Sequence, residues 1–245
     1  MRIPKNIRDN LRFLIAEVES QVSTLQTFFM MPSVSLAQRI KDRGGYAYNL
    51  KMRIHDSCLN RSAKFDGAGK QGLSLRAMES IATDLERIAE LCRDCIHQME
   101  RLQCKHCLQH TAYEPILEHI VQGIGLVERA LQESDTRLAL KIGRFEQKVG
   151  QAHKKLHKNY TAALKGKKHT EDLISALFAA HSVEQMGNAL LNVSEAIISI
   201  NLGQPVNIDR YHSMKASVEV FSLPMHPFLT NEEIDLISET IKETV

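Results

Sequence analysis

The chain has 245 residues, enough for one large domain or two domains of about 120 residues each. Hydrophobic residues make up 43% of it and charged residues 24%, which excludes a wholly disordered chain and allows a sizeable core. Lys and Arg (31) nearly balance Asp and Glu (29), and Trp is absent. The chain therefore lacks both the strong positive field and the aromatic surface typical of nucleic-acid binding, and we expect no nucleic-acid partner.

The sequence also indicates where the protein works. No apolar run approaches the roughly 18 residues that a membrane-spanning helix needs. The first 20 residues are amphipathic and include Glu17, unlike a secretory signal peptide. The five cysteines, an odd number, fit a reducing compartment better than a disulfide framework. We therefore expect a cytoplasmic protein that does not span a membrane.

Six segments carry apolar residues at steps of three and four, the period of an amphipathic helix. In chain order they cover residues 11–29, 40–58, 78–99, 116–131, 138–156 and 173–197. Short turn segments separate some of them, and residues 33–114 and 116–204 contain no proline, which would break a helix interior. An alternating strand pattern is almost absent before residue 205. The sequence predicts an all-α fold.

The six segments form two sets of three. A shift of 98 residues places Val18 on Ile116, Ile40 on Leu138 and Ile88 on Met186. One offset serves all three pairs of helices, whereas chance similarity between amphipathic helices would need a different offset for each pair. We therefore expect two tandem three-helix bundles related by a pseudo-repeat of 98 residues.

Domain boundaries follow from the repeat and from the change in composition near residue 205. The predicted units are the first bundle, the second bundle and a short C-terminal extension, over residues 1–108, 109–204 and 205–245. Within the extension we expect a loop at 207–214, an extended segment at 217–223 and a short amphipathic helix that begins with a capping box at 230–233.

Two segments resemble a known family. Residues 75–96, LRAMESIATDLERIAELCRDCI, resemble the signature helix of the PhoU family of phosphate-transport regulators. Residues 183–206 resemble that family's last helix and its closing turn. The resemblance covers residues 5–204, and it implies a cytoplasmic adaptor whose partners are a phosphate ABC transporter and a sensor histidine kinase. It leaves open whether the protein forms a homodimer.

The resemblance also implies a partner-binding surface on the best-matched helix. That helix carries Asp84, Glu86, Arg87 and Glu90 beside its apolar stripe. We predict that these four residues bind a partner protein from an exposed helix face. Charge reversal at Glu86 and Glu90 is accordingly expected to leave the fold intact.

Members of the family also bind metal through carboxylates spaced as (Asp/Glu)-x-x-x-Asp, since residues four apart on a helix share a face. Glu86 and Glu90 keep such a pair here, whereas Glu184 is followed by Asn188. The middle helices carry no such pair. We therefore expect no cofactor and no multinuclear cluster, with a weak divalent site at Glu86 and Glu90 as the alternative.

Two further groups of residues have metal-ligand spacing. Cys92, Cys95, Cys104 and Cys107 form two Cys-x-x-Cys pairs, as structural zinc sites do. However, Cys92 and Cys95 lie on an apolar stripe, so we expect them in the core, and a zinc site is the alternative. The second group consists of His153 and His157, which share a helical face but lack a third ligand.

No Gly-rich phosphate loop, nucleophile elbow or triad-like spacing occurs, so we expect no catalytic residues and no enzyme activity. The lysine-rich segment 148–168 contains no acidic residue and is either a solvated surface or a docking face for an acidic partner or lipid headgroup. Two alternatives to the adaptor remain at this point. One is a metal-binding helical bundle, and the other is a regulatory part fused to, or paired with, a phosphotransferase or another transporter.

Overall fold

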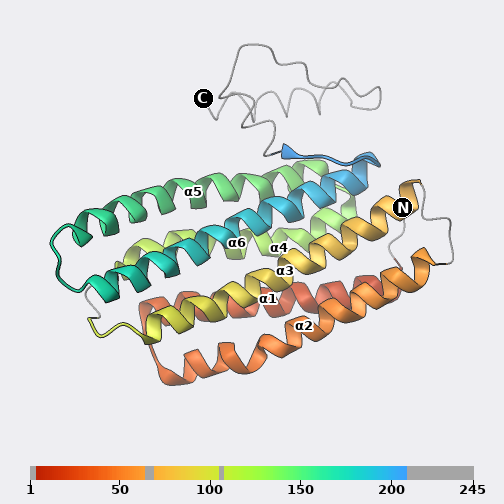
Figure 1. The fold of residues 1–245 in the computed structure, drawn as a ribbon. Helices are drawn as coiled ribbons and strands as arrows, with labels where there is room; N and C mark the ends of the chain where they lie inside the picture. The colour runs from red at the N-terminus through yellow and green to blue at the C-terminus, as the bar shows by residue number, and fades with distance from the viewer. Residues whose placement is uncertain (1–3, 64–68, 105–107, 209–245) are drawn as a thin grey trace, which may run out of the picture.

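The computed structural model describes residues 4–63, 69–104 and 108–208, and the predicted all-α fold is confirmed in these ranges (Figure 1). Six long helices account for nearly all of them. They are α1 (Lys5–Met30), α2 (Val34–Ser62), α3 (Lys70–Glu100), α4 (His110–Glu133), α5 (Thr136–Leu164) and α6 (Thr170–Leu202).

Local sequence explains where several helices begin. The Ser33 hydroxyl accepts a hydrogen bond from the backbone N–H of Leu36 and caps α2. Asp135 caps α5 in the same way. Helix α4 differs from expectation, because it begins before Pro115 and contains that proline. Pro115 removes one backbone hydrogen bond near the helix start, while the preceding turn is held by the fully buried Tyr113, which stacks on a phenylalanine of α1.

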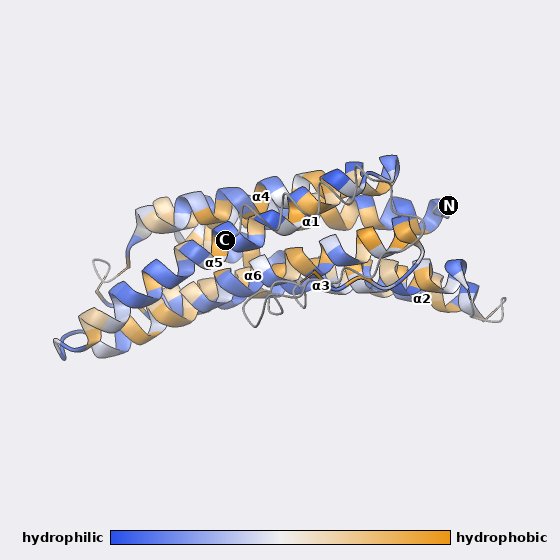
Figure 2. Ribbon diagram, turned by 90° about the horizontal axis from the view of Figure 1, so that it is seen from above, coloured by the Kyte–Doolittle hydropathy of each residue, from blue (hydrophilic) through white to orange (hydrophobic). Residues whose placement is uncertain are grey.

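The helices lie in two layers. Helices α5, α6, α3 and α2 lie side by side in one layer, and α4 and α1 form the other (Figures 1 and 2). Helices α1, α2 and α3 contact one another, as do α4, α5 and α6, so the two expected three-helix bundles are present. The bundles join along α3 with α6 and along α1 with α4.

The apolar stripes predicted from the sequence face the space between the layers, where they form one continuous core. Helix α6 is buried around most of its circumference because it contacts α3, α4 and α5. Close packing there depends on small residues. A Cβ on Gly187 would lie 2.9 Å from Cγ1 of Val149, so glycine lets α5 approach α6 closely.

The arrangement of α3 and α6 reflects the 98-residue repeat. The two helices run antiparallel, since Asp84 meets Asn192 at one end of their contact and Cys95 meets Ala179 at the other. Between these contacts the Arg87 guanidinium donates to the Gln185 side chain, 98 residues away. Equivalent residues of two repeats meet in this way only near an axis that relates the repeats, and this axis passes through the crossing of α3 and α6.

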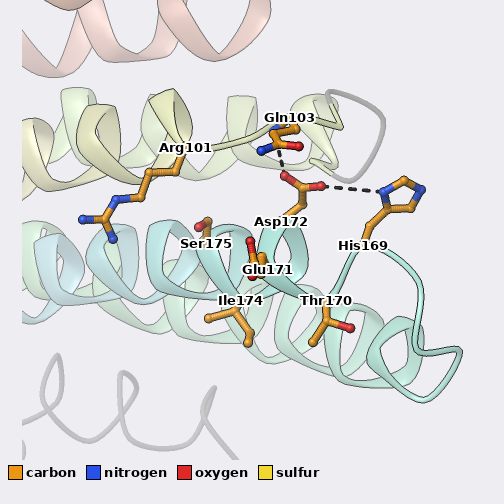
Figure 3. A pocket seen from close by; sticks show the side chains of 8 residues that line it. All are labelled: Arg101, Gln103, His169, Thr170, Glu171, Asp172, Ile174 and Ser175. Carbon is orange, nitrogen blue, oxygen red and sulfur yellow. Dashed lines mark hydrogen bonds and ion pairs between the residues drawn. The ribbon is translucent and has the colours of Figure 1, made fainter.

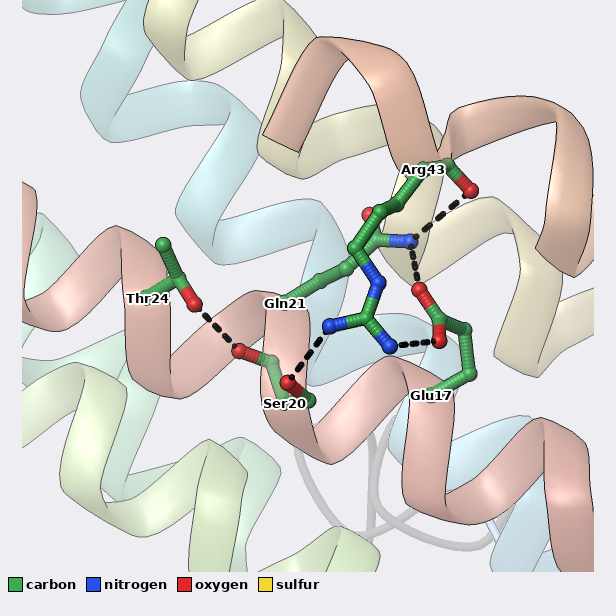
Figure 4. Close-up of polar contacts among 5 residues, drawn as sticks. All are labelled: Glu17, Ser20, Gln21, Thr24 and Arg43. Carbon is green, nitrogen blue, oxygen red and sulfur yellow. Dashed lines mark hydrogen bonds and ion pairs between the residues drawn. The ribbon is translucent and has the colours of Figure 1, made fainter. Parts of the chain in front are cut away.

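A buried charge network joins α1 to α2 (Figure 4). The Glu17 carboxylate, almost fully buried, binds the Arg43 guanidinium and accepts a hydrogen bond from the Gln21 amide at 2.9 Å. Arg43 also donates to the Ser20 hydroxyl at 3.2 Å. Every charge in the network has a partner of the opposite sign or a hydrogen bond, as burial requires.

The chain turns back at Gly203, whose φ of 70° lies in the left-handed region that favours glycine. The backbone N–H of Val206 then donates to the Ser199 hydroxyl of α6 at 2.9 Å, and Val206 and Ile208 pack against the core. The loop, extended segment and helix expected after residue 208 lie outside the described residues. The boundaries 1–108, 109–204 and 205–245 therefore stay predictions, although α3 ends and α4 begins on either side of residue 108.

Candidate functional site

The four predicted partner-binding residues lie on α3 where it crosses α6, and they differ in exposure. Arg87 and Glu90 are exposed, and Glu90 pairs with Arg93 at 3.6 Å. Asp84 is buried and accepts hydrogen bonds from Asn192 at 3.0 Å and from Ser80. Burial raises the pKa of the Asp84 carboxyl above its ordinary value, while the hydrogen bonds from Asn192 and Ser80 and the charge of Arg87 partly offset this effect.

Glu86 is also buried, which corrects the expectation that it lies on an exposed face. Only 3% of Glu86 is accessible, because α2 covers it and places the Lys51 ammonium 2.8 Å from the carboxylate. Lys51 in turn lies over the ring of Tyr48, 4.7 Å from its centroid. A Glu86→Lys substitution would set two ammonium groups against each other in a covered position. The prediction that charge reversal leaves the fold intact assumed that Glu86 is exposed, and this assumption was wrong.

The same contacts bear on the metal site predicted at Glu86 and Glu90. The Glu86 carboxylate already has Lys51 as its cation, and Glu90 has Arg93. Groups of three or more ligand atoms suited to a metal occur twice among the described residues, and neither group contains Glu86 or Glu90. Binding of a metal there stays a prediction, and it would have to displace Lys51.

In the second repeat, histidines rather than a lysine contact the carboxylate that corresponds to Glu86. Glu184, the equivalent of Glu86, contacts His153 of α5 at 2.9 Å through one carboxylate oxygen and His181 of α6 at 3.3 Å through the other. His157 lies beside His153, with ring centroids 6.0 Å apart. The sequence identified the two histidines of α5 but not their partners, which lie about 30 residues further along the chain. The repeat offers a signal for them, since Glu184 is 98 residues after Glu86.

Protonation of His153 is expected to weaken the fold at mildly acidic pH. Burial lowers the pKa of His153, the nearby His157 and His181 lower it further, and Glu184 opposes the shift. An unfolded His titrates near pH 6.5, so below about that pH the unfolded chain binds more protons than the folded chain at this position. Stability at this position should therefore be lost as the pH falls from about 6.5 through the folded pKa.

The check is the midpoint of thermal unfolding measured from about pH 7.5 to about pH 5.5. We expect His153→Gln to reduce the loss of stability on acidification, because glutamine does not titrate. His97→Gln, at an exposed position, is the matched control. An unchanged pH dependence in His153→Gln would contradict the assignment.

The four cysteines of the two predicted Cys-x-x-Cys pairs divide into two groups. Cys92 and Cys95 are fully buried on α3, which confirms the prediction that they belong to the core. Burial raises the pKa of both thiols well above the ordinary value, so they remain uncharged in the packed core. Cys104 lies beyond the end of α3, apart from them, and Cys107 lies outside the described residues.

The lysine-rich segment lies on α5 and the turn that follows it. All of its lysines are exposed, and Lys148 lies over the ring of Phe145 at 5.5 Å from its centroid. A docking role for this surface stays a prediction. None of the described helices combines the length and apolar character needed to cross a bilayer.

Comparison with known proteins tests the family resemblance. No family model matches the chain. It is 24% identical over 200 residues to the phosphate-specific transport system accessory protein PhoU of Edwardsiella tarda, across 81% of this chain and 82% of that protein. It is 23% identical over 202 residues to the phosphate-specific transport system accessory protein PhoU of Escherichia coli K12, and this match covers 82% of this chain and 84% of that protein.

The fold agrees with these relatives. The crystal structure of PhoU from Pseudomonas aeruginosa matches with a TM-score of 0.74 at 18% identity, over 82% of this chain and 97% of that one. The crystal structure of the phosphate transport system regulatory protein PhoU from Streptococcus pneumoniae matches with a TM-score of 0.75 at 14% identity, over 82% of this chain and 96% of that one. Sequence and fold thus confirm the resemblance carried by residues 75–96 and 183–206, and the chain is similar to PhoU proteins over about four fifths of its length.

Proposed function

We propose that the chain is a cytoplasmic accessory protein of phosphate transport, which regulates phosphate uptake or phosphate signalling by binding other proteins. The observation that carries this proposal is its similarity, over about four fifths of both chains, to proteins described as accessory to a phosphate-specific transport system. By the family resemblance, the partners are a phosphate ABC transporter and a sensor histidine kinase.

The contact surface is the exposed part of α3 at its crossing with α6, formed by Arg87 and Glu90, which we call the α3 surface. Both side chains are held in place, Arg87 by Gln185 and Glu90 by Arg93. The buried Asp84 and Glu86 act as positioning residues, because they bind α3 to α6 and to α2 beneath this surface. Charged groups that are already fixed can select a complementary partner and set its register.

Regulation then works through unequal binding. A bound protein shifts a partner between two states only by contacting those states with different free energies. This mechanism needs no reacting group, and we propose that the chain is not an enzyme. In the described residues, Asp84, Glu86 and Glu184 are all engaged with other side chains of the fold, which suits a structural role for them.

Exchange of the two exposed charges tests the α3 surface. The double variant Arg87→Glu with Glu90→Lys keeps the net charge and should change stability by only about 0.5 kcal/mol, since both positions are exposed. We expect it to fold normally by circular dichroism and to derepress phosphate-starvation genes in phosphate-rich medium. Copurification with the transporter and the kinase should fall in the same variant.

The matched control exchanges an exposed pair in the other layer. Arg129 and Glu133 of α4 form an ion pair at 2.9 Å, and Arg129→Glu with Glu133→Arg keeps both the pair and the net charge. We expect this control to regulate phosphate normally. A folded Arg87→Glu, Glu90→Lys variant that still binds the partners and represses the genes would refute the α3 surface, and the lysine-rich segment 148–168 would be tested next.

A further inference from the structure

Three side chains of metal-ligating type meet where the connection after α3 passes the start of α6. They are Cys104, His169 and Asp172, and a sulfur, an imidazole nitrogen and a carboxylate oxygen from them lie within 4.8 Å of one another. Figure 3 shows His169 and Asp172 directed toward each other, with Gln103 beside them. Cys104 belongs to the cysteine motif found in the sequence, but its neighbours in space come from the segment that begins α6.

The spacing of these atoms matches ligands of one ion better than a hydrogen bond. Nδ1 of His169 lies 3.7 Å from Oδ2 of Asp172, longer than a hydrogen bond between these atoms. Two ligand atoms on a tetrahedral zinc, with bonds of about 2.0–2.3 Å, lie roughly 3.3–3.7 Å apart. By contrast, Glu184 and His153 are 2.9 Å apart, which is an ordinary hydrogen-bond distance. The three ligand atoms of the first group lie within 4.8 Å of one another, so they would have to move closer together to share one ion.

The surroundings already orient the carboxylate. The backbone N–H of Gln103 donates to Oδ1 of Asp172 at 2.7 Å, which fixes the group and leaves Oδ2 facing His169. Asp172 is buried, so its negative charge is removed from water. Its place in the first turn of α6 compensates for part of this burial, and a cation between Asp172 and His169 would compensate further.

We propose that Cys104, His169 and Asp172 bind one zinc ion. Thiolate, imidazole and carboxylate are all ligands that zinc accepts, and the Cys104 thiol would release its proton to solvent on binding. Three protein ligands leave a fourth position for water or another exchangeable ligand. Two of the three ligands, His169 and Asp172, line an open pocket of about 650 Å³, whose lining also includes Arg101 and Thr170. The ion would tie the connection after α3 to the start of α6 and so stabilise one end of the bundle.

This site differs from what the sequence predicts for metal. The cysteine motif favours a site built from two Cys-x-x-Cys pairs, but burial of Cys92 and Cys95 in the core removes them as ligands. The two partners of Cys104 lie more than 60 residues further along the chain. Only the packing of the start of α6 against the end of α3 brings them together.

The test uses the full chain, reduced and freed of metal with a chelator. Zinc is added, and bound zinc is measured by equilibrium dialysis with elemental analysis. We expect one zinc per chain and a higher midpoint of thermal unfolding, because a ligand that binds the folded state stabilises it. Cobalt substituted for zinc should give a thiolate-to-cobalt charge-transfer band that is absent in Cys104→Ser.

Variants locate the site. Cys104→Ser and His169→Asn should each weaken zinc binding at least tenfold, since loss of a ligand is at least as harmful as loss of a second-shell partner. Asparagine at 169 tolerates the positive φ of 52° that the position has, so His169→Asn removes the imidazole with little backbone strain. Glu184→Gln, in the other histidine-containing group, is the control and should bind zinc normally.

Each outcome decides the proposal. Absence of bound zinc in the wild-type chain, or binding that Glu184→Gln abolishes and Cys104→Ser does not, would overturn it. Zinc binding without the charge-transfer band would overturn the role of Cys104. If Cys104→Ser were unfolded, His169→Asn with intact circular dichroism would carry the comparison.

Discussion

Replacement of Arg43 by methionine is expected to lower the free energy of unfolding by about 3 kcal/mol. The change leaves the buried Glu17 carboxylate without its cation, and removal of one partner from a buried ion pair costs about 3–5 kcal/mol. The lower end of this range applies because the Arg43 side chain is 38% exposed, so water can reach part of the vacated space. For a chain of this size the unfolding midpoint should fall by roughly 6–12 °C.

A double variant separates the charge from the packing. Glu17→Leu with Arg43→Met removes both charges and replaces them with apolar side chains, a change that is often neutral in stability. We expect it to recover most of the stability lost in Arg43→Met, as measured by urea unfolding. Equal stability of Arg43→Met and the wild-type chain would show that the pair shown in Figure 4 is not buried in solution.

Truncation of Ile88 to alanine should have an effect of similar size. Ile88 is fully buried where α3 crosses α6, and the repeat relates it to Met186, which is also fully buried. Removal of three carbons from a packed core position costs about 2–5 kcal/mol through lost burial and the cavity left behind. The same site joins the two bundles, so the loss should appear in a single cooperative unfolding transition.

The control is Leu59→Ala on α2, where the leucine is 57% exposed and the change should stay within about 0.5 kcal/mol. Urea unfolding followed by circular dichroism measures both variants. If Ile88→Ala cost no more than Leu59→Ala, the crossing of α3 with α6 would not be a packed interface.

Most of the fold could be predicted from the sequence. The apolar period predicted all six helices, and the constant shift of 98 residues paired Ile88 with Met186, both of which are fully buried. Pro115 was misleading because a proline near a helix start removes only one hydrogen bond, and α4 tolerates it. The position of Cys92 and Cys95 on an apolar stripe correctly predicted that both lie in the core.

The candidate site could be predicted only in part. The sequence placed Asp84, Glu86, Arg87 and Glu90 on one helix, but it could not distinguish the exposed pair from the buried pair. Exposure depends on how closely α2 and α6 approach α3, and Lys51 and Asn192 supply contacts that the sequence of α3 does not contain. Along the sequence, a buried carboxylate with a polar partner has the same helical spacing as an exposed carboxylate. The spacing alone therefore does not show which of the two is buried.

The two histidine-containing groups show the same limitation. His153 with Glu184, and Cys104 with His169, are pairs drawn from different helices or connections. Their spacing along the chain follows no ligand motif. They become neighbours through the packing of α5 on α6 and of α3 against the start of α6.

The most direct test of regulation by protein contact is a phosphate-starvation reporter in phosphate-rich cells that lack this chain. We expect the reporter to be active in these cells, with phosphate uptake raised, and to be silenced again when the wild-type chain is restored. The chain with Arg87→Glu and Glu90→Lys should be produced at the normal level yet fail to silence the reporter. A reporter that stays silent, with normal uptake, in cells lacking the chain would contradict the proposed role in phosphate regulation.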